Sequence, residues 1–409
     1  MSNIKKLQLI SLIGGMYYYT PIFTLLLLMR NIDLGFIVAA QTVFTVGMLL
    51  STIPTGILAD KWGQKRTIQM GLLLDALGMF LLLFTRSPAG LVVFFAIRGV
   101  GIGFRDGADE ALLYDSYIDE HKTSEGYSRA YGRLLSNDTL GFVVATAIAG
   151  LAVQFFGQAS YVPLVIATAG TSLITFLMAS TLKTCKHIAE HPVTESYFSH
   201  LKSGIKIVKK NHTIVALTLL GLLTLSGEYF LRQTYQPYFQ QMAVPAIFLG
   251  LALSAGKLLN FMAVRNSHRL EKYFTVDRIL LVINLAIGAL YLLFAFLHSV
   301  WGVVAVFMLI QALINSQSPI VSDYINQQIA SGQRSTILST VSFATSMGQV
   351  VARVLLGISI GAIGLSHTFI AQGMYLLIGT VIGIWYIRSC GCVHKVTHIA
   401  EETPEVALA

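Results

Sequence analysis

One apolar stretch of the chain carries charged side chains at intervals that would let them act together. Arg98, Arg105 and Asp109 are separated by seven and four residues, which places them on one face of a helix, and Asp106 and Glu110 share an adjacent face. A charge at the bilayer centre costs at least about 2.5 kcal/mol, so this helix must face protein or water. The charges therefore indicate a structural ion-pair network, which we favour near the end of the helix, or a site that handles ions and protons.

Isolated acids in other apolar stretches extend this chemistry. Asp75 lies near the middle of one stretch, and Asp138 lies inside another. Carboxylates that are partly buried among apolar walls can exchange protons near neutral pH. The carboxylate candidates for proton coupling are Asp75, Asp109, Glu110 and Asp138, with Glu228 behind them.

The later half of the chain has buried charges of the opposite sign. Arg232, Lys257 and Arg353 lie inside apolar stretches there, against the single acid Glu228. Buried cations would attract an anionic group on a solute, and Arg can hold a carboxylate with two parallel hydrogen bonds. Aromatic rings with a polar handle could complete a binding site, and the candidates are Tyr17, Tyr18, Tyr229 and Tyr235.

The composition places these charges in a membrane. Hydrophobic residues make up 55% of the 409 residues and charged residues only 12%, whereas soluble domains carry about 25% charged residues. We count twelve apolar stretches, each of about 20 residues and long enough to cross the hydrocarbon core as a helix. The stretches are continuously apolar, which excludes a β-barrel of alternating strands. We therefore predict an all-α integral membrane protein with twelve transmembrane helices in two sets of six.

The basic residues of the loops predict the orientation. The net charge is +8, but the bases are not gathered on a soluble module, so we expect no nucleic-acid binding. They lie in alternate loops, with only Arg30 and Arg86 on the opposite side. The positive-inside rule then places both termini in the cytoplasm. The three cysteines fall on this reducing side and imply no disulfide framework.

A short motif between the second and third apolar stretches resembles a family hallmark. Residues 56–66 must turn tightly at the membrane surface and keep their charges at the headgroups. They resemble the Gly-x-Leu-Ala-Asp-Arg-x-Gly-Arg-Lys-Arg segment of the major facilitator superfamily of secondary transporters. The matching positions are Gly56, Leu58, Ala59, Asp60, Gly63, Lys65 and Arg66. The resemblance implies the major facilitator fold, in which two pseudo-symmetric six-helix bundles rock about a midplane site.

The same resemblance implies a gate at the membrane surface. Family members often place an acid at the end of helix 4 that pairs with this loop, so Asp60, Arg66 and Asp115 would form a charge network that latches one conformation. The second half repeats these positions weakly, with a basic loop around residues 265–272 and an acid at residue 323. The gating candidates are Gly56, Asp60, Gly63, Lys65, Arg66, Asp115, Arg265, Arg269 and Asp323.

Other family patterns are met in part. Arg98, followed by Gly101 and Gly103, is similar to an Arg-x-x-x-Gly pattern that the family associates with proton coupling, although the glycine spacing differs. We add Arg98 and Arg105, the expected partner of Asp109, to the proton-coupling candidates. Antiporter branches carry a Gly-Pro pair in helix 5, and no proline is present in that stretch here.

We expect four parts along the chain. Residues 1–182 and 213–390 would form the two bundles, residues 183–212 a cytoplasmic linker with an amphipathic helix, and residues 391–409 a cytoplasmic tail. The linker histidines show no metal-ligand spacing, and we expect neither a metal site nor a cofactor. We expect a monomer.

Together these features predict a proton-coupled secondary transporter in a bacterial inner membrane. It would move a small polar, carboxylate-bearing solute, up to the size of a siderophore, by alternating access. The alternatives are a proton-driven efflux antiporter of amphipathic drugs and a transport-inactive receptor that uses the fold as a scaffold. A membrane enzyme is disfavoured, because the sequence contains no nucleophile elbow, phosphate loop or metal-ligand constellation.

Overall fold

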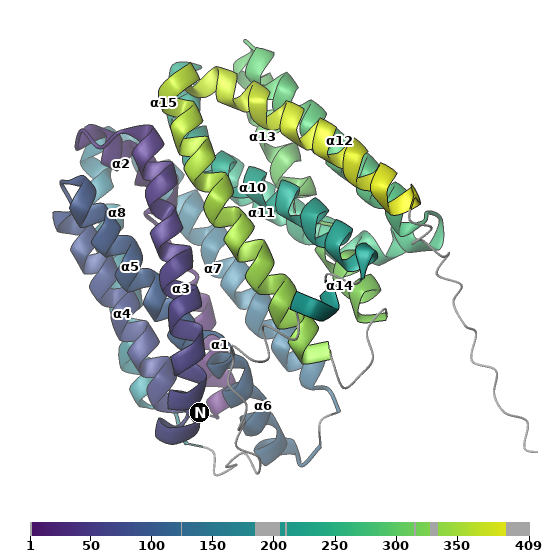
Figure 1. The fold of residues 1–409 in the computed structure, drawn as a ribbon. Helices are drawn as coiled ribbons and strands as arrows, with labels where there is room; N and C mark the ends of the chain where they lie inside the picture. The colour runs from purple at the N-terminus through teal and green to yellow at the C-terminus, as the bar shows by residue number, and fades with distance from the viewer. Residues whose placement is uncertain are drawn as a thin grey trace, which may run out of the picture.

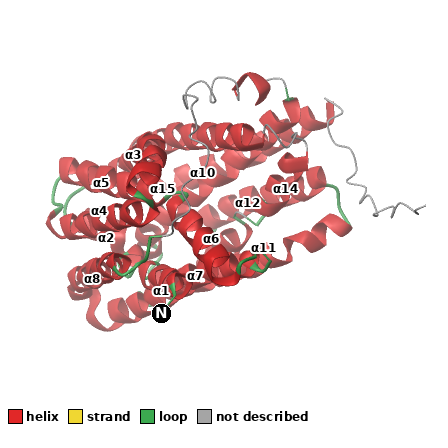
Figure 2. Ribbon diagram, turned by 90° about the horizontal axis from the view of Figure 1, so that it is seen from below, coloured by secondary structure: helices red, strands yellow, loops and turns green. Residues whose placement is uncertain are grey.

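The chain folds into helices that continuous apolar runs and local capping residues define. The computed structural model describes residues 2–123, 125–184, 205–208, 211–314, 316–327 and 334–389. Figure 1 shows the helices of the first half beside those of the second, and Figure 2 shows the short loops that join them. The helices are α1 (Asn3–Gly14), η1 (Thr20–Ile22), α2 (Phe23–Met29), α3 (Leu34–Trp62), α4 (Gln64–Phe84), α5 (Pro88–Arg105), α6 (Ala108–His121), α7 (Tyr127–Phe156), η2 (Gly157–Ser160), α8 (Tyr161–Ser180), α10 (His212–Gln241), α11 (Phe248–Asn266), η3 (Ser267–Lys272), α12 (Val276–Phe296), α13 (Val300–Leu313), α14 (Ser318–Gln327) and α15 (Arg334–Ser389).

The lengths of the apolar helices define a multi-pass membrane protein. Nine segments of the described chain are long and apolar enough to cross a membrane. Tyr127–Ser180 holds both α7 and α8, and α15 bends back at Gly364, whose φ is 78° and ψ is 170° (Figure 1). The segment formed by α1, η1 and α2 adds a further span at the N-terminus. This arrangement is consistent with the twelve predicted spans.

Three of the expected spans are broken rather than continuous. The first is non-helical at residues 15–19, after Gly14-Gly15 and before Pro21, so Tyr17 lies in a break. The fourth is interrupted by Gly107, whose φ of 79° favours glycine, and the tenth is interrupted between α13 and α14. The broken fourth and tenth spans occupy equivalent positions in the two halves, which agrees with the weak internal repeat.

The family motif lies mostly within helices. α3 continues to Trp62 and α4 begins at Gln64, so Gly63 alone joins them, with a φ of 83°. We expected a longer loop, because charged residues usually mark the end of a span. Here the charged segment continues α3 beyond its apolar part by another turn or more.

Several helices of one half pack on helices of the other. Among the described residues, α3 packs on α15, α7 on α11, and α10 on α2 and α3. Gly35 and Gly357 bring α3 and α15 so close that a Cβ on either would lie 2.5 Å from the other's carbonyl oxygen. Close backbone approach through small residues is a usual way for membrane helices to associate.

Polar contacts between the two halves lie toward one end of the molecule. The Thr146 and Ser254 hydroxyl oxygens are 2.6 Å apart, and the Ile247 amide donates to Gln154 Oε1 at 3.1 Å. Across the described chain, the hydrogen bonds between the halves come from residues 20–45 and 143–154 of the first half and from residues 233–254 and 350–353 of the second. We call this set the closed seam. It lies away from the end at which α1 begins and α3 turns into α4.

The predicted division of the chain falls largely outside the described residues. The linker 183–212 is described only at residues 183–184, 205–208 and 211–212, and the tail 391–409 is not described. The four parts and the boundaries between them therefore stay a prediction.

Candidate functional site

A cavity of about 360 Å³ lies between the two halves, beside the closed seam. The first half contributes wall residues from the break in the first span and from α2, α3, α5 and α7, and the second half contributes residues from α10 and α11. The polar and charged wall residues are Tyr17, Tyr19, Thr20, Gln41, Arg98, Asp138, Tyr229, Arg232, Gln233, Gln236 and Lys257. The apolar residues of the wall are Phe23, Phe44, Phe95, Ile102 and Phe142. A cavity between the halves is where a rocking-bundle transporter holds its solute.

The Arg98 guanidinium is held by partners of its own half. Its Nε and Nη2 atoms lie 2.9 and 2.8 Å from Asp75 Oδ1, and Nη1 donates to the Tyr19 hydroxyl at 2.7 Å. The second carboxylate oxygen of Asp75 accepts a hydrogen bond from Ser172 at 2.8 Å. Gly78 makes room for this pair, because a Cβ there would lie 2.5 Å from Arg98 Cγ. Asp75 and Arg98 thus form a buried, nearly saturated ion pair at the edge of the cavity.

The second arginine of this span is also paired. Arg105 donates from Nε and Nη2 to Asp109 Oδ2, at 3.0 and 2.7 Å, across the break at Gly107. The predicted pair forms although the helix is not continuous. Asp109 Oδ1 is buried and has no hydrogen-bond partner among the described atoms. Neither residue belongs to the cavity wall, so this pair lies below the site rather than in it.

Two cations of the second half face the cavity without a carboxylate partner. Arg232 of α10 and Lys257 of α11 line the wall, and no described carboxylate lies within 4.0 Å of either. Arg232 lies over the ring of Tyr229, with 5.1 Å between the guanidinium carbon and the ring centroid. Asp138 of α7 is the one carboxylate among the described wall residues, and it lines the same cavity as Lys257. The cavity therefore keeps an excess of positive charge available to a ligand.

Arg353 lies behind the cavity rather than in its wall. It is 2% exposed, and its guanidinium carbon lies 3.8 Å from the Tyr229 ring centroid. It donates to the Gln41 carbonyl at 3.2 Å, to the Thr45 hydroxyl, and to Gln349 Oε1 at 3.1 Å, while Nε has no partner among the described atoms. Arg353 thus fixes the ring that Arg232 also contacts and joins α15 to α3. Its expected direct contact with a solute is not available in this conformation.

The other predicted binding residues divide between wall and core. Tyr17 and Tyr229 line the cavity, but Tyr18 and Glu228 are only half-buried and lie outside its wall. Tyr235 is fully buried, donates to the Leu249 carbonyl at 2.9 Å and stacks on Phe307. In this conformation Tyr235 is therefore a core residue outside the cavity wall, and this depends on the rotation of α10, which spacing within one helix does not reveal.

Several wall residues were not singled out from the sequence. Gln236 accepts a hydrogen bond from the Thr24 amide at 2.8 Å and donates to the Thr20 carbonyl at 2.9 Å. Gln233 donates to Gln41 Oε1 at 3.2 Å, so these glutamines bridge α10 to the first half. The signal in the sequence was the presence of uncharged glutamines inside apolar stretches. The prediction of binding residues considered charged and aromatic side chains and left these glutamines out.

The gating candidates lie at the end away from the closed seam. Asp115 accepts a hydrogen bond from Gln64 Nε2 at 2.8 Å, and Arg66 is exposed and more than 4.0 Å from it, so the expected Arg66–Asp115 pair is not formed in this conformation. Gly56 and Asp60 belong to α3, and the surroundings of the two residues lie outside the described set. Lys65 is half-buried at the start of α4, and Glu110 is exposed near Tyr127.

The equivalent residues of the second half lie at the ends of their helices. Arg265 is in the last turn of α11, Arg269 is exposed in η3, and Asp323 is exposed in α14, which contacts η3. Their gating roles stay a prediction.

Comparison with known proteins identifies the class to which this fold and cavity belong. The family model of the Major Facilitator Superfamily matches residues 7–283, so the chain belongs to that superfamily. It is a multi-pass membrane transporter of small-molecule solutes rather than an enzyme, as the sequence predicted.

Individual relatives agree with this assignment. The chain is 20% identical over 375 residues to YxaM, an uncharacterised MFS-type transporter of Bacillus subtilis (strain 168), covering 90% of this chain and 91% of YxaM. A mutant of the nucleoside transporter NupG superposes with a TM-score of 0.78 at 15% identity, over 94% of this chain and 99% of NupG. A bacterial homologue of the human lysosomal transporter Spinster, in an inward-facing and unoccupied conformation, gives 0.71 at 14% identity, over 95% and 96%. These structures share the fold.

Proposed function

We propose that this transporter carries a small organic solute with a carboxylate or another anionic group, bound between Arg232 and Lys257. The observation that carries the proposal is the contrast within one cavity: Arg98 is neutralised by Asp75, whereas Arg232 and Lys257 have no carboxylate partner. An anion that accepts charge-assisted hydrogen bonds from both would replace water at these groups. The phenylalanines and tyrosines of the first half would pack on the organic part of the solute.

The size of the cavity narrows the solute class. Its volume of about 360 Å³ lies at the small end of the roughly 300–1,000 Å³ typical of ligand pockets. A metabolite-sized acid fits this volume better than a polycarboxylate siderophore, which the sequence alone had left open. Because NupG shares the fold and is a nucleoside transporter, nucleosides also belong in the panel to be tested.

Proton coupling would act through Asp138. Asp138 and Lys257 line the same cavity, so an ionised Asp138 would compete with an anionic solute for that cation. Protonation of Asp138 would free Lys257 for the solute. Proton and anion then bind with positive cooperativity, as a symporter requires. The affinity for the anion would therefore rise as pH falls through the pKa of Asp138.

The direction in which the cavity opens follows from the closed seam. The hydrogen bonds between the halves gather at one end, and the bases of the loops gather at the other. The positive-inside rule assigns the basic end to the cytoplasm, so we take this conformation as closed to the outside and both termini as cytoplasmic. A bacterial inner membrane is the location that these features support.

Ligand stabilisation of the purified transporter tests the proposal. Unfolding temperatures would be measured at pH 6 and pH 8 with small carboxylates, phosphorylated metabolites, nucleosides, sugars and lipophilic cations. We expect one anionic class to stabilise the protein more strongly at pH 6, and Asp138→Asn to remove the difference between the two pH values. Stabilisation by neutral nucleosides alone would count against an anionic solute. An equal effect at both pH values in the unaltered protein would count against proton coupling.

Matched variants locate the site. Arg232→Gln with Lys257→Gln should abolish stabilisation by the anion, whereas Lys206→Gln with Arg278→Gln removes two exposed bases outside the cavity and should preserve it. Retained anion binding in the first pair would place the solute elsewhere.

An efflux antiporter of lipophilic cations is the second candidate. The aromatic rings around the cavity and the single carboxylate Asp138 favour it, because a cation can bind over ring faces beside an acid. Stabilisation only by lipophilic cations, together with loss of that effect in Asp138→Asn, would select this candidate and make Arg232 and Lys257 structural.

A further inference from the structure

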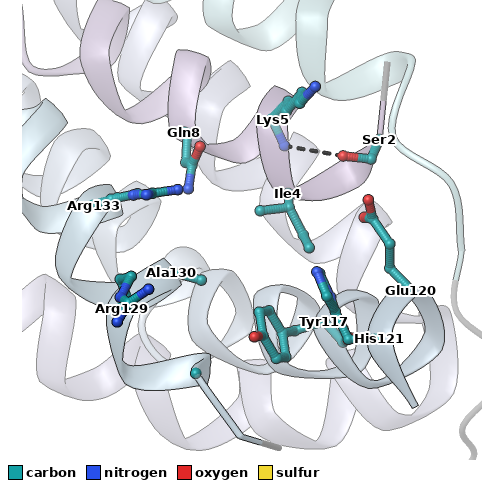
Figure 3. Close-up of a pocket in the computed structure, with 11 residues that line it drawn as sticks. Ser2, Ile4, Lys5, Gln8, Tyr117, Glu120, His121, Arg129, Ala130 and Arg133 are labelled. Atoms are coloured by element: carbon teal, nitrogen blue, oxygen red, sulfur yellow. Dashed lines mark hydrogen bonds between the residues drawn. The ribbon is translucent and has the colours of Figure 1, made fainter. Parts of the chain in front are cut away.

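A second cavity, of about 300 Å³, lies away from the solute site at the end of the first half where α1 begins (Figure 3). Residues from the start of α1, the end of α6 and the start of α7 line it. Lys5, Arg129, Arg133 and His121 contribute to the lining, against the single acid Glu120. We propose that this cavity binds the phosphate group of an anionic membrane lipid.

The cations of this cavity are free to bind an anion. No described carboxylate lies within 4.0 Å of Lys5, Arg129 or Arg133, whereas Arg98, Arg105 and Arg388 are each paired. Arg129 and Arg133 lie one turn apart on α7, and like charges at this spacing destabilise a helix unless an anion lies between them. Figure 3 shows Arg133 extended beside Gln8 of α1, with Arg129 one turn away. The arginines therefore offer planar groups that can hold a phosphate by several hydrogen bonds.

The rings beside the cavity place it at the level of lipid headgroups. Tyr127 lies 5.0 Å from Tyr114, 6.1 Å from Tyr117 and 6.1 Å from Tyr131 between ring centroids. Tyrosines gather where the membrane meets water, with their rings among the headgroups. Basic cavities between helices at the cytoplasmic surface are suited to anionic headgroups.

An apolar surface continues from the cavity along α7. Residues seven and eleven positions after Arg133 fall on its face of the helix, and these are Leu140 and Val144. Their side chains are 52% and 39% exposed. A lipid phosphate at Arg133 would place its acyl chains along these residues, whereas free inorganic phosphate would make no use of them. The combination selects a lipid as the source of the phosphate.

The test compares lipids and charge-matched variants of the full chain. The transporter would be placed in nanodiscs of phosphatidylcholine alone or mixed with phosphatidylglycerol, and its unfolding temperature and its retention of phosphatidylglycerol in native mass spectrometry would be measured. We expect phosphatidylglycerol to raise the unfolding temperature. Arg129→Gln with Arg133→Gln should weaken phosphatidylglycerol retention by about tenfold or more. Lys206→Gln with Arg278→Gln, which removes the same charge from exposed positions of the same end, should retain it.

Three results would overturn the proposal. The first is retention of phosphatidylglycerol by the double arginine variant at the level of the unaltered protein. The second is an equal loss in the charge-matched control, which would show a general effect of net charge. The third is full protection by inorganic phosphate in detergent with no further effect of the lipid, which would assign the cavity to a soluble anion. Arg129→Lys with Arg133→Lys should recover part of the retention if the charge, rather than folding of α7, is responsible.

Discussion

The first and second halves treat their buried cations differently. Arg98 and Arg105 in the first half each meet an aspartate of the same half at 2.7–3.0 Å. Arg232, Lys257 and Arg353 in the second half have no carboxylate within 4.0 Å among the described residues. A paired charge contributes to the fold but offers little to a ligand, whereas an unpaired charge beside a cavity can bind one. Removing each cation or its partner should therefore have effects of different kinds.

The largest effect on stability is expected from Asp75→Asn. The change leaves the Arg98 guanidinium buried without its counterion, and breaking a buried pair in this way costs about 3–5 kcal/mol. Equilibrium unfolding of the purified protein measures this loss. Ser172→Ala, which removes one hydrogen bond from the same carboxylate, serves as the control and should cost only about 1 kcal/mol. Equal stability of Asp75→Asn and the unaltered protein would show that the pair is not formed.

Arg232→Gln should reduce ligand affinity and leave stability nearly unchanged. A hydrogen bond to a charged group contributes about 1.5–3 kcal/mol, so the dissociation constant of the anionic solute should rise roughly tenfold to a hundredfold. Arg232 is half-buried and faces the cavity, and its loss leaves no charge unpaired inside the protein. Isothermal titration checks the affinity. A large loss of stability with unchanged affinity would show that Arg232 stabilises the fold, as Arg98 does, and does not bind the solute.

Arg353→Met tests a buried cation that is neither ion-paired nor in the cavity wall. The variant loses the hydrogen bonds to α3 but also removes a desolvated charge, so the two terms offset each other and stability should change by no more than about 2 kcal/mol. Tyr229 would lose the guanidinium that lies over its ring. We expect weaker ligand binding through misplacement of Tyr229. Arg353→Lys keeps the charge but not the planar group over the Tyr229 ring. Its ligand affinity should therefore lie between that of the unaltered protein and that of Arg353→Met.

The architecture was predictable because helix length in a membrane depends directly on apolar length. The breaks at residues 15–19 and at Gly107 were not predicted, because a polar interruption of one turn barely changes the average hydropathy of a span. Gly14-Gly15 before Pro21 and the pair Asp106-Gly107 were the local signals. The first break matters for the site, since it places Tyr17 and Tyr19 in the cavity wall.

The pairing of Asp75 with Arg98 could not be predicted from the sequence, for a different reason. Asp75 and Arg98 are 23 residues apart on different helices, and their contact depends on how α4 and α5 are rotated about their axes. The sequence showed an acidic half and a basic half, but not that the acid at residue 75 is already occupied by an arginine. By contrast, Arg105 and Asp109 were correctly expected to pair from their spacing of four residues, and they do so although the helix breaks at Gly107 between them.

Asp109→Asn should have the smallest effect on stability. It tests whether the value of an ion pair in the first half depends on how deeply the pair is buried. The Arg105–Asp109 pair has the same chemistry as Arg98–Asp75, but its side chains are 20% and 23% exposed, against 10% and 7%. Water can therefore solvate Arg105 when its partner is neutralised, and screening reduces the value of the pair. The loss should be about 1 kcal/mol in equilibrium unfolding, and added salt should narrow the difference from the unaltered protein. If Asp109→Asn were as damaging as Asp75→Asn, the unpartnered Oδ1 atom and the break at Gly107, rather than solvent exposure, would determine the stability of this region.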